Sequence, residues 1–182
     1  IWDLLVNHRE SPLGIGTERL CFSFLSDTDD AFCAELYDGE SRVANRTVRL
    51  CEAHCFSFVV SLQPGTLYEY RVTGSDGTSA SARFETGIVF DAPFITPEQT
   101  DLTSPMLTRR FTVETLPAKS RLYMTGLGLY RAELNGERVG DLYLTPGYND
   151  YDAYLRYQTY DVTGLLREGE NCLTVSLGDG WY

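Results

Sequence analysis

The acidic residues that could carry chemistry in this 182-residue chain fall into two short groups. One group is Asp27, Asp29 and Asp30, and the other is Asp150 and Asp152. Cleavage of a glycosidic bond needs two carboxyl groups that face each other roughly 5–10 Å apart. Both groups lie in turn-like sequence, where Asp is expected because it bonds its own backbone. We therefore predict no catalytic residues in this chain.

Tyrosines recur every third residue in the stretch PGYNDYDAYLRYQTYDVT, residues 146–163. This interval matches neither the 3.6-residue period of a helix nor the two-residue period of a strand. We interpret Pro146–Asp152 as a loop that enters a strand at about Leu155. On this interpretation Tyr157 and Tyr160 point to opposite faces of the strand, one into the core and one outward. The candidates for touching a ligand are then Tyr148, Tyr151 and Tyr154.

A carbohydrate site combines an aromatic face with carboxylates and amides that bind hydroxyl groups, sometimes through calcium. Residues of these kinds stand on predicted turns or strand ends, where function is often found. The candidates for carbohydrate binding are Asn135, Tyr148, Asp150, Tyr151, Asp179 and Trp181, and those for calcium are Asp150 and Asp152. The calcium pattern lacks the glycine and terminal glutamate of an EF-hand loop. A structural role stays open for each residue: Asn135 in a hairpin turn, and Trp181 in the core or against another domain.

Charge and hydropathy exclude two classes of partner. The formal charge is −11, from 26 acidic and 15 basic residues, and a negative field repels phosphate backbones. The longest apolar runs, such as Phe56–Leu62, are far shorter than the roughly 20 residues of a membrane helix. We therefore predict no nucleic acid and no membrane as partners.

The cysteines are five in number: Cys21, Cys33, Cys51, Cys55 and Cys172. This odd set in a chain of ordinary domain size favours reduced, mostly buried thiols, and so a cytoplasmic rather than a secreted or periplasmic location. A removed leader would leave the same residues. Cys51, His54 and Cys55 are spaced like half of a metal site, but no second Cys/His pair completes four ligands.

Short segments rich in Val, Phe, Tyr and Leu recur between turn signals along the whole chain, which is typical of antiparallel all-β domains. We predict two consecutive β-sandwiches. Residues 1–87 form a fibronectin type III or immunoglobulin-like sandwich, residues 88–105 a proline-containing connector, and residues 106–182 a jelly-roll, carbohydrate-binding-like sandwich. Because the chain ends on Trp181-Tyr182 with no strand to cover them, we expect the second domain to be truncated and the chain to be part of a longer protein.

The expected strands of the first domain are Arg19–Leu25, Phe32–Tyr37, Cys55–Leu62, Leu67–Thr73 and Ala80–Glu85. Those of the second are Met106–Val113, Arg121–Thr125, Leu129–Leu134, Leu155–Val162 and Cys172–Leu177. Asn135-Gly136 is a strong hairpin signal. Thr163–Leu166 predicts one helical turn with Thr163 as its cap.

The motifs of the chain resemble the N-terminal region of bacterial α-L-rhamnosidases. In the first domain, Ser11-Pro-Leu-Gly-Ile15 is similar to the family's opening motif, with Ser in place of the usual Asn, and Arg83-Phe-Glu-Thr-Gly87 is similar to the segment that closes its fibronectin-like domain. The denser resemblance lies in the second domain, at Ser104-Pro105, Arg109–Phe111, Gly126–Tyr130, Leu134–Gly136, Arg138–Asp141, Pro146-Gly147, Asp150-Tyr151, Tyr157–Thr163 and Gly178–Tyr182. Two residues depart from the family pattern: Tyr148 replaces a common Trp, and Tyr154 replaces a frequent Arg.

This resemblance implies an accessory fragment of a glycosidase that removes terminal L-rhamnose from glycosides or polysaccharides. It implies a catalytic (α/α)₆ domain downstream in the same chain, so that the fragment alone is inert as a hydrolase. It also implies that the second domain either binds a rhamnose-containing glycoside, in some members with calcium, or supports the catalytic domain. The alternative is a non-enzymatic adhesion or scaffold protein of tandem β-sandwiches.

Overall fold

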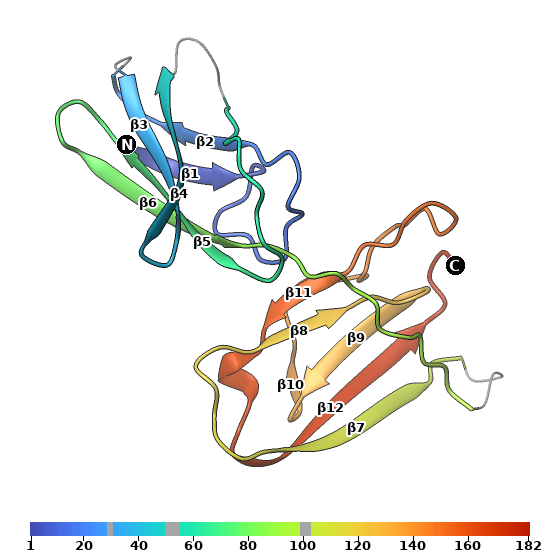
Figure 1. The fold of residues 1–182 in the computed structure, drawn as a ribbon. Helices are drawn as coiled ribbons and strands as arrows, with labels where there is room; N and C mark the ends of the chain where they lie inside the picture. The colour runs from blue at the N-terminus through green and yellow to red at the C-terminus, as the bar shows by residue number, and fades with distance from the viewer. Residues whose placement is uncertain (29–30, 50–54, 99–102) are drawn as a thin grey trace. The chain divides into compact units, whose positions relative to one another are not determined.

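The computed structural model describes residues 1–28, 31–49, 55–98 and 103–182. It divides the chain into two compact units, Ile1–Asp91 and Ala92–Tyr182, each built from two antiparallel sheets (Figure 1). Helix within the described ranges is limited to one 3₁₀ turn, η1 (Thr163–Leu165). The predicted all-β sandwich fold is confirmed, whereas the fibronectin-like and jelly-roll topologies remain predictions. No helix in the described ranges is long and apolar enough to cross a membrane.

The first unit pairs its strands in a two-stranded and a four-stranded sheet. The small sheet is β1 (Trp2–Val6) with β2 (Phe22–Leu25). The larger sheet has the order β4-β3-β5-β6, with bounds Ser41–Arg49 for β4, Ala31–Asp38 for β3, Leu67–Thr73 for β5 and Ser79–Glu85 for β6.

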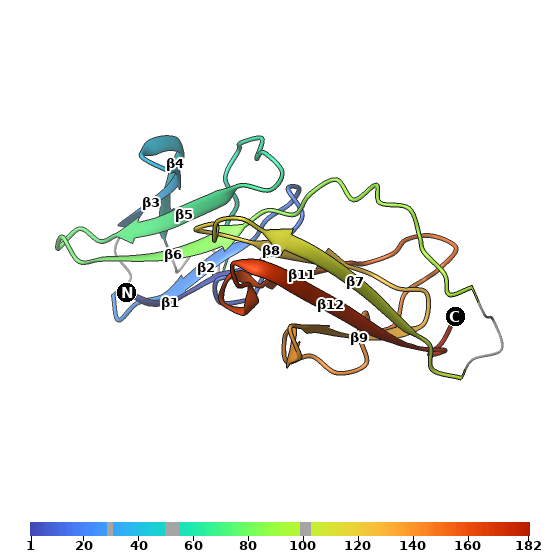
Figure 2. The ribbon, with the colours of Figure 1, turned by 90° about the horizontal axis from the view of Figure 1, so that it is seen from below.

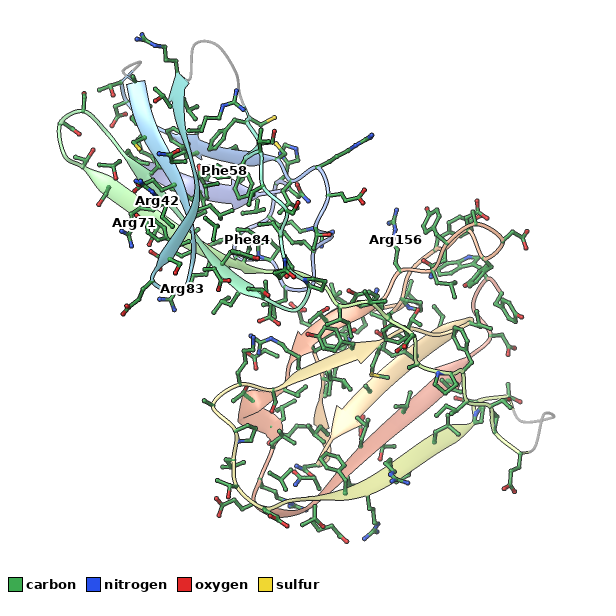
Figure 3. The ribbon with its side chains drawn as sticks, in the orientation of Figure 1. Arg42, Phe58, Arg71, Arg83, Phe84 and Arg156 are labelled. Carbon is green, nitrogen blue, oxygen red and sulfur yellow. The ribbon has the colours of Figure 1, made fainter. Side chains whose placement is uncertain are left out.

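Aromatic side chains fill the space between these two sheets. Along β5, Tyr68, Tyr70 and Val72 alternate inward because successive residues of a strand face opposite sides. The ring of Phe22 from β2 lies 5.0–5.9 Å, centroid to centroid, from four other aromatic rings: Phe56, Phe58, Tyr70 and Phe84. Buried residues come from both sheets, so the core lies between two layers. Figure 3 shows Phe58 and Phe84 on this side, with Arg42, Arg71 and Arg83 on the other.

Two strand predictions in the first unit need correction, and two strands were missed. The chain from Cys55 to Leu62 forms no strand and pairs only at Phe56, which exchanges two backbone hydrogen bonds with Phe22. The predicted strand Arg19–Leu25 begins only at Phe22. β1 and β4 were not predicted. β4 has one buried residue among nine, so the apolar alternation that predicts a strand is absent from its sequence.

The second unit has a four-stranded sheet of order β10-β9-β12-β7 and a two-stranded sheet of β11 and β8. Figure 2 shows β7, β12 and β9 side by side. The strand bounds are Met106–Val113 for β7, Arg121–Met124 for β8, Leu129–Leu134 for β9, Glu137–Arg138 for β10, Gln158–Asp161 for β11 and Gly169–Gly178 for β12. Its core is smaller and gathers around Tyr130, Leu134 and Tyr160.

Local predictions in the second unit were confirmed in part. Asn135 and Gly136, with φ of 57° and 84°, form the two-residue turn between β9 and β10. The predicted strand Leu155–Val162 narrows to Gln158–Asp161. The helical turn forms, but the prediction that Thr163 caps it is wrong. Val162 occupies the cap position, and Thr163 Oγ1 instead accepts a hydrogen bond of 2.8 Å from the backbone N–H of Ser120.

The four described cysteines form no disulfide, and Cys51 lies outside the described ranges. Cys33 and Cys55 are exposed, so the prediction of mostly buried thiols is wrong for these two. Burial, together with the neighbouring thiol of Cys55, raises the pKa of Cys21 to about 11. Cys21 is therefore a protonated thiol at neutral pH.

Candidate functional site

The loop between Thr145 and β11 holds its shape through its own hydrogen bonds. Asn149 is buried, with 1% of its surface exposed, and its Oδ1 accepts a bond of 3.0 Å from the backbone N–H of Arg156. The carbonyl of Asp150 accepts from the backbone N–H groups of Ala153 and Tyr154, at 3.0 and 2.8 Å. These bonds close the loop and leave the ring of Tyr148 at the surface, 72% exposed.

The C-terminal segment after β12 meets this loop. The rings of Tyr151 and Tyr182 lie edge to face, with centroids 5.2 Å apart. Trp181 stands three residues after the end of β12 at Gly178, and it is 54% exposed. Aromatic surface from two distant parts of the sequence is thus gathered at one end of the second unit, which we call the loop end (residues 126–128, 146–156 and 178–182).

The turn at Gly128 fixes the path of this C-terminal segment. Its φ is +93°, and an added Cβ would lie 2.5 Å from the carbonyl oxygens of both Gly178 and Asp179. Only glycine permits that backbone conformation and that approach. The position of Trp181 therefore depends on a backbone contact that no side chain could replace.

Two polar groups at the loop end are buried and have no hydrogen-bond partner among the described residues. They are Nδ2 of Asn149 and the hydroxyl of Tyr151. Buried polar groups are nearly always paired, since an unpaired one costs about 1–3 kcal/mol. These two groups are therefore candidates for bonding to a molecule that binds at the loop end.

The carboxylates predicted for calcium lie on the exposed side of the same loop. Asp150 and Asp152 are exposed, as is Asp179 in the C-terminal segment. Calcium takes six to eight oxygen ligands. Within the described ranges, no three His, Cys, Asp or Glu side chains group closely enough to hold a metal ion. This donor set does not fit a calcium site, and we assign no step to calcium.

Asn135 does not belong to the loop end. Its Nδ2 donates to Oδ1 of Asn171 and to the carbonyl of Leu165, both at 2.8 Å, and its Oδ1 accepts from the backbone N–H of Cys172 at 2.9 Å. Asn171 and Cys172 stand near the start of β12, whereas the loop end lies past its finish at Gly178. The structure thus brings Tyr151 to the C-terminal segment and places Asn135 at the far end of the strand, in a structural role.

Tyr157 and Tyr160, which were predicted to lie on opposite faces of one strand, do not share a strand, because β11 begins at Gln158. Tyr160 is buried, and its hydroxyl lies 3.0 Å from that of Tyr130. Tyr157 is half-buried, with its ring centroid 6.0 Å from that of Tyr123. Tyr154 is about half-exposed beneath the guanidinium of Arg156, which extends away from the unit in Figure 3.

A small pocket of about 140 Å³ opens beside the loop end and was missed by the sequence reasoning. The buried residues Ala132, Val139 and Tyr160 line it, together with the half-buried Arg138 and the exposed Tyr143. In the sequence, Arg138 stood out only as the first residue of the motif Arg138–Asp141. The sequence pattern that could have indicated this pocket is Leu142-Tyr143-Leu144, three large apolar residues in succession. In the structure they lie in a loop and are more than half exposed.

Several of the weighed chemical groups cannot be placed. Asp29, Asp30, Cys51 and His54 lie outside the described residues. The interpretations of the aspartate group at residues 27–30 and of the half metal site at residues 51–55 therefore rest on the sequence alone.

The second unit is similar in sequence to part of known α-L-rhamnosidases. The family model of the α-L-rhamnosidase N-terminal domain matches residues 116–182. An α-L-rhamnosidase of Streptomyces avermitilis is 52% identical over 65 residues, which are 36% of this chain and 6% of that protein. An α-L-rhamnosidase of an Alteromonas species, strain LOR, is 34% identical over 90 residues, 48% of this chain and 10% of that protein.

Solved structures extend the similarity to both units. The structure of an α-L-rhamnosidase from Dictyoglumus thermophilum matches 100% of this chain with a TM-score of 0.84 and 25% identity. The native enzyme from Aspergillus terreus matches 98% with a TM-score of 0.70 and 29% identity. The predicted resemblance to the N-terminal region of α-L-rhamnosidases is confirmed. The match spans only about a quarter of each solved chain, 25% and 24%.

Proposed function

We propose that this chain is the N-terminal accessory region of an α-L-rhamnosidase and that its second unit binds rhamnose-containing carbohydrate at the loop end. The observation that carries the proposal is the meeting of the loop with the C-terminal segment through Tyr151 and Tyr182. This contact gathers the exposed rings of Tyr148 and Trp181 at one end of the unit. Hydrolysis of terminal L-rhamnose belongs, in this proposal, to a catalytic domain elsewhere in the parent protein.

The chemistry of the loop end suits a neutral sugar. Aromatic rings cover the apolar face of a pyranose, while carboxylates accept hydrogen bonds from its hydroxyl groups. The exposed carboxylates of Asp150 and Asp179 supply acceptors. The unpartnered Nδ2 of Asn149 and hydroxyl of Tyr151 supply buried donors beneath the surface.

Calorimetric titration of the 182-residue chain with L-rhamnose tests this proposal. We expect saturable heat, and a loss of affinity of roughly 2–10-fold for Trp181→Ala and for Tyr148→Ala, since each removes an aromatic contact. Trp2→Ala is the matched control, because Trp2 is a similarly exposed tryptophan of the first unit, 45% exposed. Equal affinity in all four proteins would place binding elsewhere. Absence of heat would favour the alternative role, a scaffold or a support for the catalytic domain.

The assignment of catalysis to another domain has its own assay. The chain should not hydrolyse an aryl α-L-rhamnoside above the rate of buffer. Efficient turnover by the purified chain would contradict it.

A further inference from the structure

The pocket beside the loop end lies between β9 and the loop segment 141–145, which we call the covering loop. At the end of the covering loop, the carbonyl of Thr145 accepts a hydrogen bond of 2.8 Å from the backbone N–H of Tyr130, and the Thr145 hydroxyl donates one of 2.6 Å to the carbonyl of Tyr130. Near the start of the covering loop, the guanidinium of Arg138 donates a hydrogen bond to the carbonyl of Leu142. The covering loop and Ala132 of β9 both line the cavity of about 140 Å³.

Arg138 differs from its neighbours in its charge partners. Arg131, which also lines the pocket, is paired with Glu133 at 2.8 Å. Arg138 has no ion pair with any described carboxylate, although the chain carries 26 acidic residues. Guanidinium presents five donors in a fixed fork, and the bond to Leu142 uses one of its two terminal nitrogens. A positive group with free donors is thus held at the mouth of a cavity.

Tyr143 adds an aromatic surface to the same mouth. The guanidinium carbon of Arg138 lies 4.1 Å from the centroid of the Tyr143 ring, an arrangement that holds both groups in place. Tyr143 remains 81% exposed, so the guanidinium covers only part of it. The deeper part of the cavity is apolar, formed by Ala132 and Val139.

We propose that this pocket binds a sugar acid, with the carboxylate on Arg138 and the pyranose ring against Tyr143. The planar fork of guanidinium matches a carboxylate in two parallel hydrogen bonds. The cavity is below the roughly 300–1,000 Å³ of a drug-sized site, so it takes a single ring. The choice of a sugar among carboxylates rests on the proposed carbohydrate function of this unit. The acid can be a free monosaccharide or one residue of an acidic polysaccharide.

Titration of the ¹⁵N-labelled 182-residue chain with D-glucuronate, followed by amide NMR, tests the proposal. We expect shifts at Ala132, Val139 and Leu144, and an affinity for D-glucose at least roughly tenfold weaker, because glucose lacks the charged partner. Comparing free glucuronate with a glucuronate-containing oligosaccharide separates the two sources, since the tighter ligand is the natural form. Shifts of equal size with glucose, or no shifts at these amides, would overturn the proposal.

Two variants and a control assign the binding to this pocket. Arg138→Gln keeps an amide donor for Leu142 and should weaken glucuronate binding at least roughly tenfold. Tyr143→Ala keeps the guanidinium and should weaken it roughly 2–10-fold. Arg109→Gln, an exposed arginine of β7, is the matched control and should bind like the parent chain. Unchanged affinity in Tyr143→Ala and in a folded Arg138→Gln, judged by circular dichroism, would contradict the assignment.

The proposed function and this pocket fail in different ways. L-rhamnose carries no carboxylate, and its proposed contacts are at residues 148–151 and 179–182. Loss of rhamnose binding with glucuronate binding intact would remove only the loop-end proposal. The reverse result would remove only the pocket.

Discussion

At the scale of single residues, backbone glycine and buried amide groups determine which candidate side chains come together. The sequence placed Asn135, Tyr151 and Trp181 in one candidate set. The hydrogen bonds of Asn135 to Asn171 and Cys172 assign it to the hairpin end instead. No sequence pattern signals such long-range amide bonds, because their partners are 36 and 37 residues away. Tyr151 could be predicted as a loop residue, but not its contact with Tyr182.

Gly128 provides a residue-scale prediction. Gly128→Ala should lower the free energy of unfolding of the second unit by about 2–4 kcal/mol, since it combines a strained positive φ with a Cβ 2.5 Å from two carbonyl oxygens. Gly164→Ala is the control, because its added Cβ meets nothing within 4 Å, and should change stability by less than about 0.5 kcal/mol. Hydrogen exchange of the β12 amides measures both. Equal protection in the two variants would contradict the role given to Gly128.

At the scale of elements, alternating apolar residues predicted strands whether one face is fully buried, as in β5, or only partly buried, as in β7. Leu67–Thr73, Met106–Val113 and Leu129–Leu134 were predicted with the bounds that they have. β4 was missed because it is an edge strand whose side chains are nearly all exposed. A strand was predicted at Cys55–Leu62 because its apolar residues alternate. In the structure this segment packs those residues on the core without pairing as a strand, so alternation alone does not distinguish the two cases.

An ion pair between β3 and β4, Glu35 with Arg42, should make the stability of the first unit depend on pH. Hydrogen bonding to Arg42, at 2.7 Å, is the main cause that lowers the pKa of Glu35, and Tyr37 adds a second bond. A lowered folded-state pKa means that this carboxylate stabilises the fold above its unfolded pKa of about 4.3 and ceases to do so as the pH falls through the folded pKa. Glu35→Gln should therefore show a smaller drop in Tm between pH 7 and pH 3 than the parent chain.

The expected difference is small because Arg42 is 53% exposed. Such a pair contributes at most about 1 kcal/mol, which corresponds to about 4 °C in a unit of this size. Glu40→Gln, in the exposed turn after β3, should retain the full drop and serves as the control. Differential scanning calorimetry at pH 7 and pH 3 measures the drop in Tm for the parent chain and for both variants. A parent and a Glu35→Gln chain with the same pH response would show that this pair does not stabilise the unit.

At the scale of the whole molecule, the two all-β units are similar to part of solved α-L-rhamnosidases, and the family model of the α-L-rhamnosidase N-terminal domain matches residues 116–182. Motif resemblance predicted this relationship, since the matching segments stand in the family's order. It did not predict the pocket of Arg138 and Tyr143, which depends on how residues 141–145 fold back onto β9. The fold was therefore more accessible from sequence than the site.

The most direct test of the central claim is amide NMR of the chain titrated with L-rhamnose, with and without calcium. We expect shifts concentrated at residues 148–151 and 179–182, with no requirement for calcium. Saturating rhamnose that leaves these amides unmoved while the protein stays folded would contradict carbohydrate binding at the loop end.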